Sequence, residues 1–176
     1  MIGLRKSKLV RELLNSVNFP AMIRSYFLFI GFLFSTLLSA ENDVYRVPIH
    51  GTIDMGLPHF IQRGVEEAEA NDARVIIFDI DTFGGRVDAA TQIKDIILDS
   101  KVTTIAFINK RAISAGALIS LSCDSIFMTP GASIGAATAV DLEGKKASEK
   151  VISFMREEMA STAEATGRPR KIAEAM

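Results

Sequence analysis

Two short apolar runs, each ending in glycine or other small residues, constrain the fold of this chain more than any other feature. The run Ile76-Ile-Phe-Asp-Ile-Asp-Thr-Phe-Gly-Gly85 is rich in β-branched residues and ends in a double glycine. A second run leads into Ile113-Ser-Ala-Gly116. Runs of this kind are typical of strands buried in a parallel sheet. A strand that ends in Gly-Gly can direct backbone N–H groups into a cleft, because glycine tolerates positive φ and close approach.

Strand and helix patterns alternate over residues 44–176. Strands are predicted over residues 44–49, 75–80, 102–108 and 125–128, helices over residues 58–70, 86–98, 114–121 and 148–166, and a turn-rich loop over residues 130–135. Pro48 predicts an edge strand, because proline cannot donate to a ladder. Ser148 is a predicted N-cap, and Gly167 is predicted to end the last helix. Strands that alternate with helices indicate parallel βα units, so the predicted fold class is α/β.

The first forty residues differ from the rest in charge and hydropathy. Residues 1–40 carry five basic residues and one acid, and residues 41–176 carry the remaining 15 basic and 20 acidic residues. Residues 26–38 are almost wholly apolar. A signal-peptide core needs roughly 7–15 apolar residues, whereas a transmembrane helix needs about 20. We therefore predict a signal peptide or N-terminal membrane anchor over residues 1–40 and an exported, membrane-associated domain over residues 41–176, on the periplasmic or extracytoplasmic side.

Composition excludes several classes of function. The acidic balance of residues 41–176 argues against nucleic-acid binding. The single cysteine, Cys123, cannot form an intrachain disulfide, and its apolar context predicts an inert buried thiol. With two histidines and one cysteine, the spacing of a metal site is absent, and no metal is expected.

Ser114 is a candidate nucleophile. A serine at a strand-to-helix turn can present its hydroxyl beside preorganised amides, which is the arrangement that acyl transfer needs. The N–H of Ala115, at the helix N-terminus, is one candidate oxyanion donor, and the segment Gly84-Gly85 is the other.

Lys150 is the candidate base for this serine, because both histidines precede the first buried strand. A lysine base must be neutral, whereas the ordinary lysine pKa is about 10.4. The first turn of a helix disfavours the ammonium form, and the apolar Val151 and Ile152 predict a buried amine. Ser133 is a candidate hydrogen-bond partner for that amine. Each pattern alone is also typical of a tight turn, close helix packing or a surface lysine, so the residues by themselves indicate only a candidate Ser/Lys hydrolase.

Three motifs together resemble the membrane-bound ClpP-class serine proteases of the NfeD type, which are related to signal peptide peptidase A. They are Asp79-Ile-Asp-Thr-Phe-Gly-Gly-Arg86, Ser114-Ala-Gly116 and Pro130-Gly-Ala-Ser-Ile-Gly-Ala136, in the order found in that family. The chain departs from the family's pattern at Phe83, where proline is usual. The resemblance implies a ClpP/crotonase-like spiral of βα units over residues 41–176.

The resemblance also implies a site. Its serine–lysine dyad falls on Ser114 and Lys150, and its oxyanion glycines fall on Gly84 and Gly85. It further implies no cofactor, a preference for hydrophobic stretches of membrane-associated substrates, and a homo-oligomer.

The leading prediction is therefore an exported serine endopeptidase that cleaves hydrophobic segments of membrane-associated proteins. An alternative is a truncated, catalytically inactive ClpP-like module that binds membrane-protein partners. That alternative rests on residues 170–176, where the chain ends just as a new helical pattern begins, which predicts a domain that is incomplete at its C-terminus. The acyl-CoA chemistry of crotonase relatives is a third reading, which the export signal disfavours.

Overall fold

The computed structural model describes residues 43–137 and 148–176, so the predicted signal or anchor segment lies outside the described residues. The strands are β1 (Val44–Ile53), β2 (Val75–Gly85), β3 (Thr104–Ile113), β4 (Ser125–Met128) and β5 (Ser133–Gly135). The helices are α3 (Leu57–Ala70), α4 (Val87–Leu98), α5 (Ala115–Ser122), α6 (Glu149–Ala165) and α7 (Arg170–Glu174). Among these helices, none combines the length and the apolar character needed to cross a membrane.

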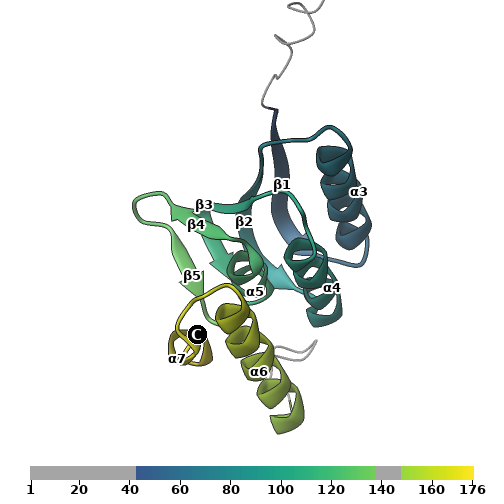
Figure 1. Cartoon of the computed structure of the whole chain (residues 1–176). Coiled ribbons are helices and arrows are strands. Elements are labelled where there is room, and N and C mark those ends of the chain that lie inside the picture. Colours follow the sequence, from purple (N-terminus) through teal and green to yellow (C-terminus); the bar gives the residue numbers. More distant parts are fainter. Residues whose placement is uncertain (1–42, 138–147) are drawn as a thin grey trace, which may run out of the picture. The chain divides into compact units, whose positions relative to one another are not determined.

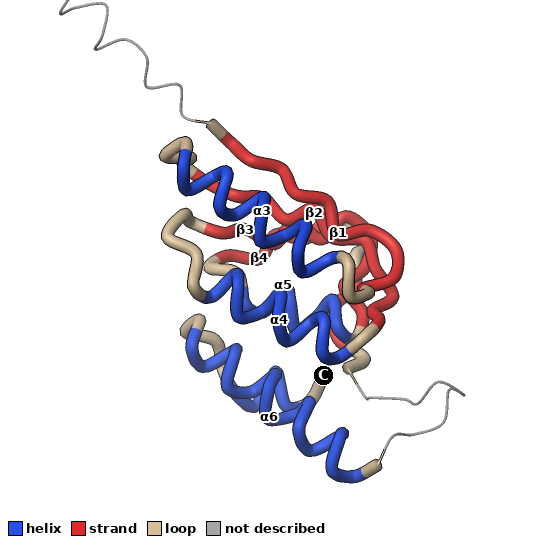
Figure 2. Tube along the Cα trace, turned by 90° about the vertical axis from the view of Figure 1, so that its right-hand side faces the viewer, coloured by secondary structure: helices blue, strands red, loops and turns tan. Residues whose placement is uncertain are grey.

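All strand pairings in the sheet are parallel. The strand order is β1-β2-β3-β4, and β5 pairs with the end of β3 beyond the stretch that β4 covers. Helices α3 and α5 contact the sheet directly, α4 packs against α3 and α5, and α6 packs against α4 and α5 (Figures 1 and 2). Because each helix runs back against the strands, the helices begin at the edge of the sheet where β1, β2 and β3 end (Figure 2). The α/β fold expected from the sequence is confirmed.

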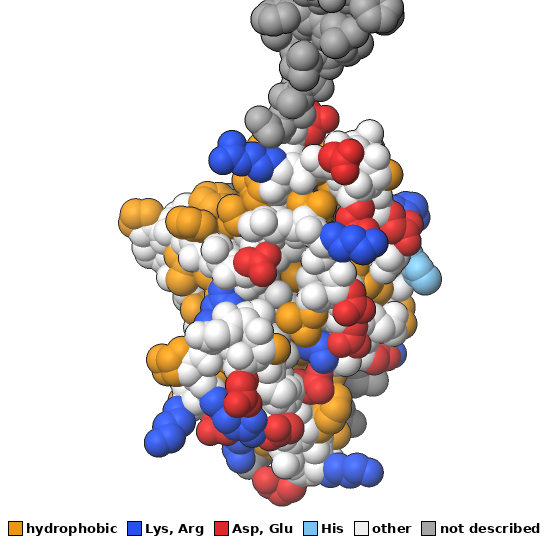
Figure 3. Space-filling view, in the orientation of Figure 1, with side chains coloured by type: hydrophobic (Ala, Val, Ile, Leu, Met, Phe, Trp, Pro, Cys, Tyr) orange, Lys and Arg blue, Asp and Glu red, His pale blue; other side chains and the backbone are white. Residues whose placement is uncertain are grey.

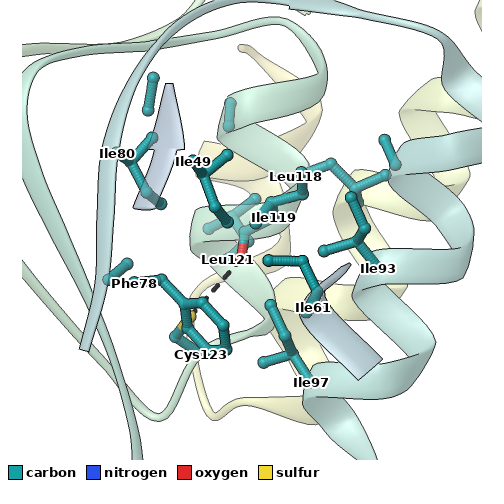
Figure 4. Packing of buried hydrophobic residues seen from close by; sticks show 14 of the residues in the cluster. Ile49, Ile61, Phe78, Ile80, Ile93, Ile97, Leu118, Ile119, Leu121 and Cys123 are labelled. Carbon is teal, nitrogen blue, oxygen red and sulfur yellow. Dashed lines mark hydrogen bonds between the residues drawn. The ribbon is translucent and has the colours of Figure 1, made fainter. Parts of the chain in front are cut away.

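The hydrophobic core lies between the central strand β2 and helix α5. Phe78 and Ile80 of β2 pack toward Leu118 and Ile119 of α5, and all four are fully buried (Figure 4). All eight residues of α5 are buried, which fits a helix with no polar face. Cys123 follows this helix and is also fully buried, as its apolar context predicted. Burial raises the pKa of its thiol, which keeps the sulfur protonated and unreactive.

The strands run further than the hydrophobic pattern predicts. Strand β2 continues through Gly85, because Thr52 and Ile53 of β1 pair with Gly84 and Gly85. The predicted loop over residues 130–135 is wrong at its end, since Ser133–Gly135 forms β5 opposite residues 111–113 of β3. The position of β1 at the sheet edge and the N-cap of α6 are confirmed: the Ser148 hydroxyl accepts the N–H of Val151.

Charged side chains of both signs cover α6 and α7 in the space-filling view, whereas hydrophobic side chains gather over β4 and the turn toward β5 (Figure 3). Arg170 of α7 forms ion pairs with Glu157 and Glu164 of α6 and with Glu174 of its own helix. Phe127 of β4 leaves 57% of its surface exposed. The mixed charges tie α7 to α6 but create no single-sign patch on this face.

Arg168 joins the end of α6 to the end of α5. Its guanidinium donates to the carbonyl oxygens of Leu121 at 3.2 Å, Cys123 at 2.9 Å and Asp124 at 3.2 Å. The Thr166 hydroxyl donates to the same Leu121 carbonyl at 2.9 Å. A positive group here also complements the negative end of the α5 dipole. The contact therefore fixes the C-terminal end of α6 against the C-terminal end of α5.

Replacing Arg168 by methionine should lower the free energy of unfolding by about 2–3 kcal/mol, because three carbonyls of the α5 terminus lose a charged donor. Urea denaturation followed by circular dichroism measures this loss. Arg156→Met is the matched control, since Arg156 is exposed and should tolerate the change. Equal stability of the two variants would contradict the role assigned to Arg168.

Candidate active site

Ser114 occupies a strained turn between β3 and α5. Its backbone has φ 54° and ψ −116°, which side-chain-bearing residues rarely adopt. Two backbone hydrogen bonds hold it there: Ser114 N–H donates to the Gly135 carbonyl at 2.8 Å, and Ala117 N–H donates to the Ser114 carbonyl at 2.9 Å. The turn resembles the strained strand-to-helix elbow that exposes a nucleophilic serine in other hydrolases. The Ser114 side chain is half-buried.

Gly84 at the end of β2 packs directly against this turn. A Cβ built on Gly84 would lie 2.9 Å from both the Ile113 carbonyl oxygen and the Ser114 Cβ, and 3.3 Å from the Ala115 nitrogen. Gly84 also has φ +102°, which favours glycine. The structure therefore brings together three of the residues that the sequence selected, Gly84, Ser114 and Ala115.

Thr82 fixes the position of Gly84, and the sequence analysis did not identify it. Its buried hydroxyl accepts the N–H of Gly84 at 2.9 Å and donates to the Gly51 carbonyl of β1. Its methyl group lies against α5, since a Cβ built on Gly116 would be 2.5 Å from Thr82 Cγ2. One side chain thus joins β1, the end of β2 and the start of α5. The feature of the sequence that could have indicated this role is a lone threonine within an apolar run.

The predicted oxyanion donors differ in how accessible their N–H groups are. The Gly84 N–H is already donated to Thr82. Gly85 lies opposite Ile53 in the β1–β2 ladder, where a Cβ would come within 2.1 Å of the Ile53 carbonyl oxygen. The Ala115 N–H, in the first position of α5, is donated to no residue among those the structure describes. In this conformation the Ala115 N–H is therefore open to an anion, whereas the Gly84 N–H is not.

Lys150 and Ser133 lie in separate elements of the described structure. Lys150 lies in the first turn of α6, and Ser133 lies in β5 opposite Arg111. Both side chains are exposed, and within the part of the chain that the structure describes no hydrogen bond joins either of them to the other or to Ser114. The predicted burial of the Lys150 amine is wrong for the described residues, because Ile152 rather than Lys150 lies on the buried face of α6. The roles of Lys150 and Ser133 stay predictions.

An open apolar groove lies between the start of α4 and the start of α6. Its volume is about 590 Å³, and its lining residues are Arg86, Val87, Asp88, Thr91, Val151 and Phe154. The groove places Val151, which follows Lys150, close to Arg86, which follows Gly85. Figure 2 likewise shows α6 beginning at the edge where the strands end. The first turn of α6 and the glycines of β2 therefore border the same surface.

Two of the residues that line this groove, Arg86 and Asp88, are charged. The Arg86 guanidinium donates to the Asp88 carboxylate, and this hydrogen bond lowers the pKa of Asp88 from its ordinary value. Because both side chains are exposed, this ion pair contributes little to stability.

Neither histidine hydrogen-bonds Ser114. His50 Nε2 of β1 lies 3.2 Å from Asp79 Oδ2, and Arg46 donates to the same carboxylate oxygen. Asp79 is buried, and its other oxygen has no hydrogen-bond partner within the described structure. His59 is exposed on α3. Among the described residues, no hydrogen bond therefore brings either histidine to Ser114.

A parallel α/β domain with a strained serine between strand and helix, packed on a glycine at the end of the neighbouring strand, defines a ClpP-like serine protease fold. Comparison with solved structures agrees. A variant of ClpP1 from Listeria monocytogenes superposes with a TM-score of 0.60 at 26% identity and covers 81% of this chain and 82% of that chain.

The chain belongs to the family described as NfeD1b, N-terminal domain, whose model matches residues 43–176. It is 40% identical to membrane protein NfeD1b of Bacillus subtilis over 136 residues, and this stretch covers 77% of this chain and 31% of the relative. It is 35% identical over 151 residues to membrane-bound protease PH1510 of Pyrococcus horikoshii, which is 81% of this chain and 34% of the relative. The chain therefore spans about a third of the length of these curated relatives. The expected NfeD-type, ClpP-class resemblance is confirmed.

Two solved variants of the 1510-N membrane-bound stomatin-specific protease are also similar. One carries a serine-to-alanine substitution, and the match covers 69% of that chain. The other carries a lysine-to-alanine substitution and was solved with a substrate peptide, and the match covers 65% of that chain. Each has a TM-score of 0.72, 34% identity and 77% coverage of this chain. The family thus includes a membrane-bound protease.

The strain at Ser114 predicts an unusual order of stability. Ser114→Gly should raise the free energy of unfolding by about 1 kcal/mol relative to Ser114→Ala, because glycine adopts this backbone without a Cβ penalty. Equilibrium urea unfolding of the two variants compares them directly. If Ser114→Ala is the more stable variant, the turn is not strained as described.

The packing of Thr82 on α5 predicts a compensating pair of substitutions. Gly116→Ala should cost about 2–3 kcal/mol of unfolding free energy, because the added methyl overlaps Thr82 Cγ2. Thr82→Ser removes that methyl and keeps the hydroxyl. In the double variant the cost of Gly116→Ala should fall to below about 1 kcal/mol, measured by a double-mutant cycle of urea unfolding. Simple additivity would show that this contact does not limit residue 116.

Proposed function

We propose that this domain is an exported serine endopeptidase in which Ser114 is the nucleophile and Lys150 is the general base and then the general acid. The observation that carries this proposal is the packing of Gly84 on the strained Ser114 turn, beside the undonated N–H of Ala115. The solved relatives with single serine and lysine substitutions give it further support.

The chemistry follows from these groups. The Ser114 hydroxyl oxygen attacks the carbonyl carbon of the scissile peptide, and its proton passes to the neutral Lys150 amine. The carbonyl oxygen becomes an oxyanion, which accepts a hydrogen bond from the Ala115 N–H. Collapse of this intermediate breaks the C–N bond, and Lys150 returns the proton to the leaving amine. Water then hydrolyses the ester on Ser114 by the same steps. The Gly84 N–H joins the oxyanion hole only if it leaves Thr82.

The groove beside Lys150 supports an apolar substrate. Val87, Val151 and Phe154 supply the apolar part of its lining. An apolar peptide segment lying there would exclude water from the first turn of α6, and removal of water favours the neutral form of an amine. Binding of substrate would therefore prepare the base, which is exposed without it. Segments of membrane-associated proteins are the substrates that fit this surface. The proposed enzyme is an exported, membrane-associated homo-oligomer.

A second candidate function is a catalytically silent module that binds membrane-protein partners through the same groove. The exposed position of Lys150, with no hydrogen bond to Ser114, favours this alternative. The two functions differ in whether bound peptide is cleaved.

The test is cleavage of an apolar, fluorescence-quenched peptide by the full chain purified in detergent. Ser114→Ala and Lys150→Ala should each lower kcat/KM by about a thousandfold or more, because the nucleophile and its base act as one unit. The wild-type rate should rise with pH, since the amine must be neutral to accept the proton.

Lys171→Ala is the matched control, because Lys171 is an exposed lysine on α7 and should leave the rate unchanged. Retained cleavage by Ser114→Ala would reject the nucleophile. Binding without cleavage by the folded wild-type chain would select the silent module.

A further inference from the structure

Residues 135–137 support the Ser114 turn from outside β3 and α5. The Gly135 carbonyl accepts the Ser114 N–H at 2.8 Å. Gly135 is buried at the end of β5 and has φ +122°, and Ala136 after it has φ 51°. Two consecutive residues therefore have positive φ, and the second carries a Cβ, which disfavours this conformation. A segment of this kind keeps its shape only while surrounding contacts hold it.

Met176, two residues after α7, supplies such contacts. Its carbonyl accepts the N–H of Ala137 at 2.8 Å. Its side chain covers Gly135, since a Cβ built on Gly135 would lie 3.6 Å from Met176 Cγ and 3.7 Å from Met176 Cβ. Apart from the two chain neighbours of Gly135, no other residue that the structure describes comes within 4 Å of that position. Met176 therefore holds residues 135–137 through both its backbone and its side chain.

Helix α7 fixes the place of Met176. The Met176 N–H donates to the carbonyl of Ala173, a buried residue of α7, at 3.3 Å, and Arg170 ties the helix to α6 by ion pairs. The Met176 side chain also borders a cavity of about 230 Å³, which is lined by residues of α6 and α7 and by Ala137. This space gives the side chain room to withdraw from Gly135. The position of the Ser114 amide is thus linked, contact by contact, to the packing of α7.

The hold on Gly135 bears on the aim of the Ser114 hydroxyl. The Ser114 backbone is strained, and its N–H is one of the groups that keep it so. If the Gly135 carbonyl withdraws, the turn relaxes and carries the hydroxyl oxygen away from the carbonyl carbon that it attacks. A displacement of about 1 Å at a reacting atom is enough to cost about a hundredfold in rate. The peptide groove is lined by other residues, at the starts of α4 and α6, so peptide binding does not depend on this contact.

We propose that Met176 is a positioning residue for Ser114. It holds the Gly135 carbonyl where the Ser114 N–H can donate to it, and it thereby keeps the hydroxyl aimed for attack. This inference rests on the proposed endopeptidase function and adds to it a residue from a different part of the chain. Met176 itself takes no part in bond breaking.

Cleavage of the apolar, fluorescence-quenched peptide by the full chain in detergent measures this role. Met176→Ala keeps the carbonyl but removes the side chain beyond Cβ, so it should lower kcat about tenfold and leave KM unchanged. Met176→Leu restores a carbon at the Cγ position and should recover most of the wild-type kcat. Ile172→Ala is the matched control, because Ile172 is an exposed apolar residue of α7 and should leave both constants unchanged. A raised KM with unchanged kcat in Met176→Ala would contradict the positioning role.

Hydrogen exchange of single amides tests the same contact without catalysis, by mass spectrometry of the full chain with electron-transfer fragmentation. In Met176→Ala the Ser114 amide should exchange about tenfold faster than in the wild type. The Phe78 amide, in the central strand β2 between β1 and β3, should exchange at the wild-type rate. Unchanged exchange at Ser114, or an equal increase at both amides, would overturn the proposal. Absence of cleavage by the wild-type chain would reject the endopeptidase function, whereas faster exchange at Ser114 alone would still support the hold of Met176 on the turn.

Discussion

The structure depends on one close approach, that of the end of β2 to the turn between β3 and α5. Gly84 and Ser114 are so close that a single additional carbon atom on Gly84 would overlap the turn. Parallel pairing of β2 with both β1 and β3 creates this approach, because it fixes the ends of the two strands at one edge of the sheet. Thr82 then fixes the position of Gly84, because its hydroxyl accepts the Gly84 N–H and donates to the Gly51 carbonyl. The Ser114 hydroxyl and the amides around it are consequently positioned by the sheet itself.

The polar groups of the site depend on an apolar helix. Helix α5 is buried on every side, so its first amides cannot shift without moving the core. The strained backbone of Ser114 is maintained by this packing and by the hydrogen bond to Gly135. The single strand β5, only three residues long, therefore contributes directly to the candidate site by accepting the Ser114 N–H. A small motif of glycines and a serine functions only because a large hydrophobic layer fixes it.

The sequence predicted the parts of this arrangement that arise from local patterns. The apolar run before Gly84 and the small residues after Ser114 gave the strands, the turn and the three residues that meet there. Sequence patterns failed where tertiary pairing decides the outcome. Ser133 and Gly135 of strand β5 have turn propensity, and the strand forms because the end of β3 offers it a partner. The hydrogen bond from Gly84 to Thr82, and the exposure of Lys150, depend on how separate elements pack, which the spacing of residues along the chain does not encode.

The way in which α6 is attached has a mechanical consequence for Lys150. Two polar contacts of α6, the ion pair of Glu158 with Lys94 and the hydrogen bonds of Arg168 with α5, lie in its second half or beyond its end. Apolar packing holds its first half, because Ile152 and Met155 are buried. Lys150 therefore lies only two residues from a packed side chain. The orientation of the candidate base follows from this packing, so a change at residue 152 should be felt at the amine although the two side chains point to different faces of the helix.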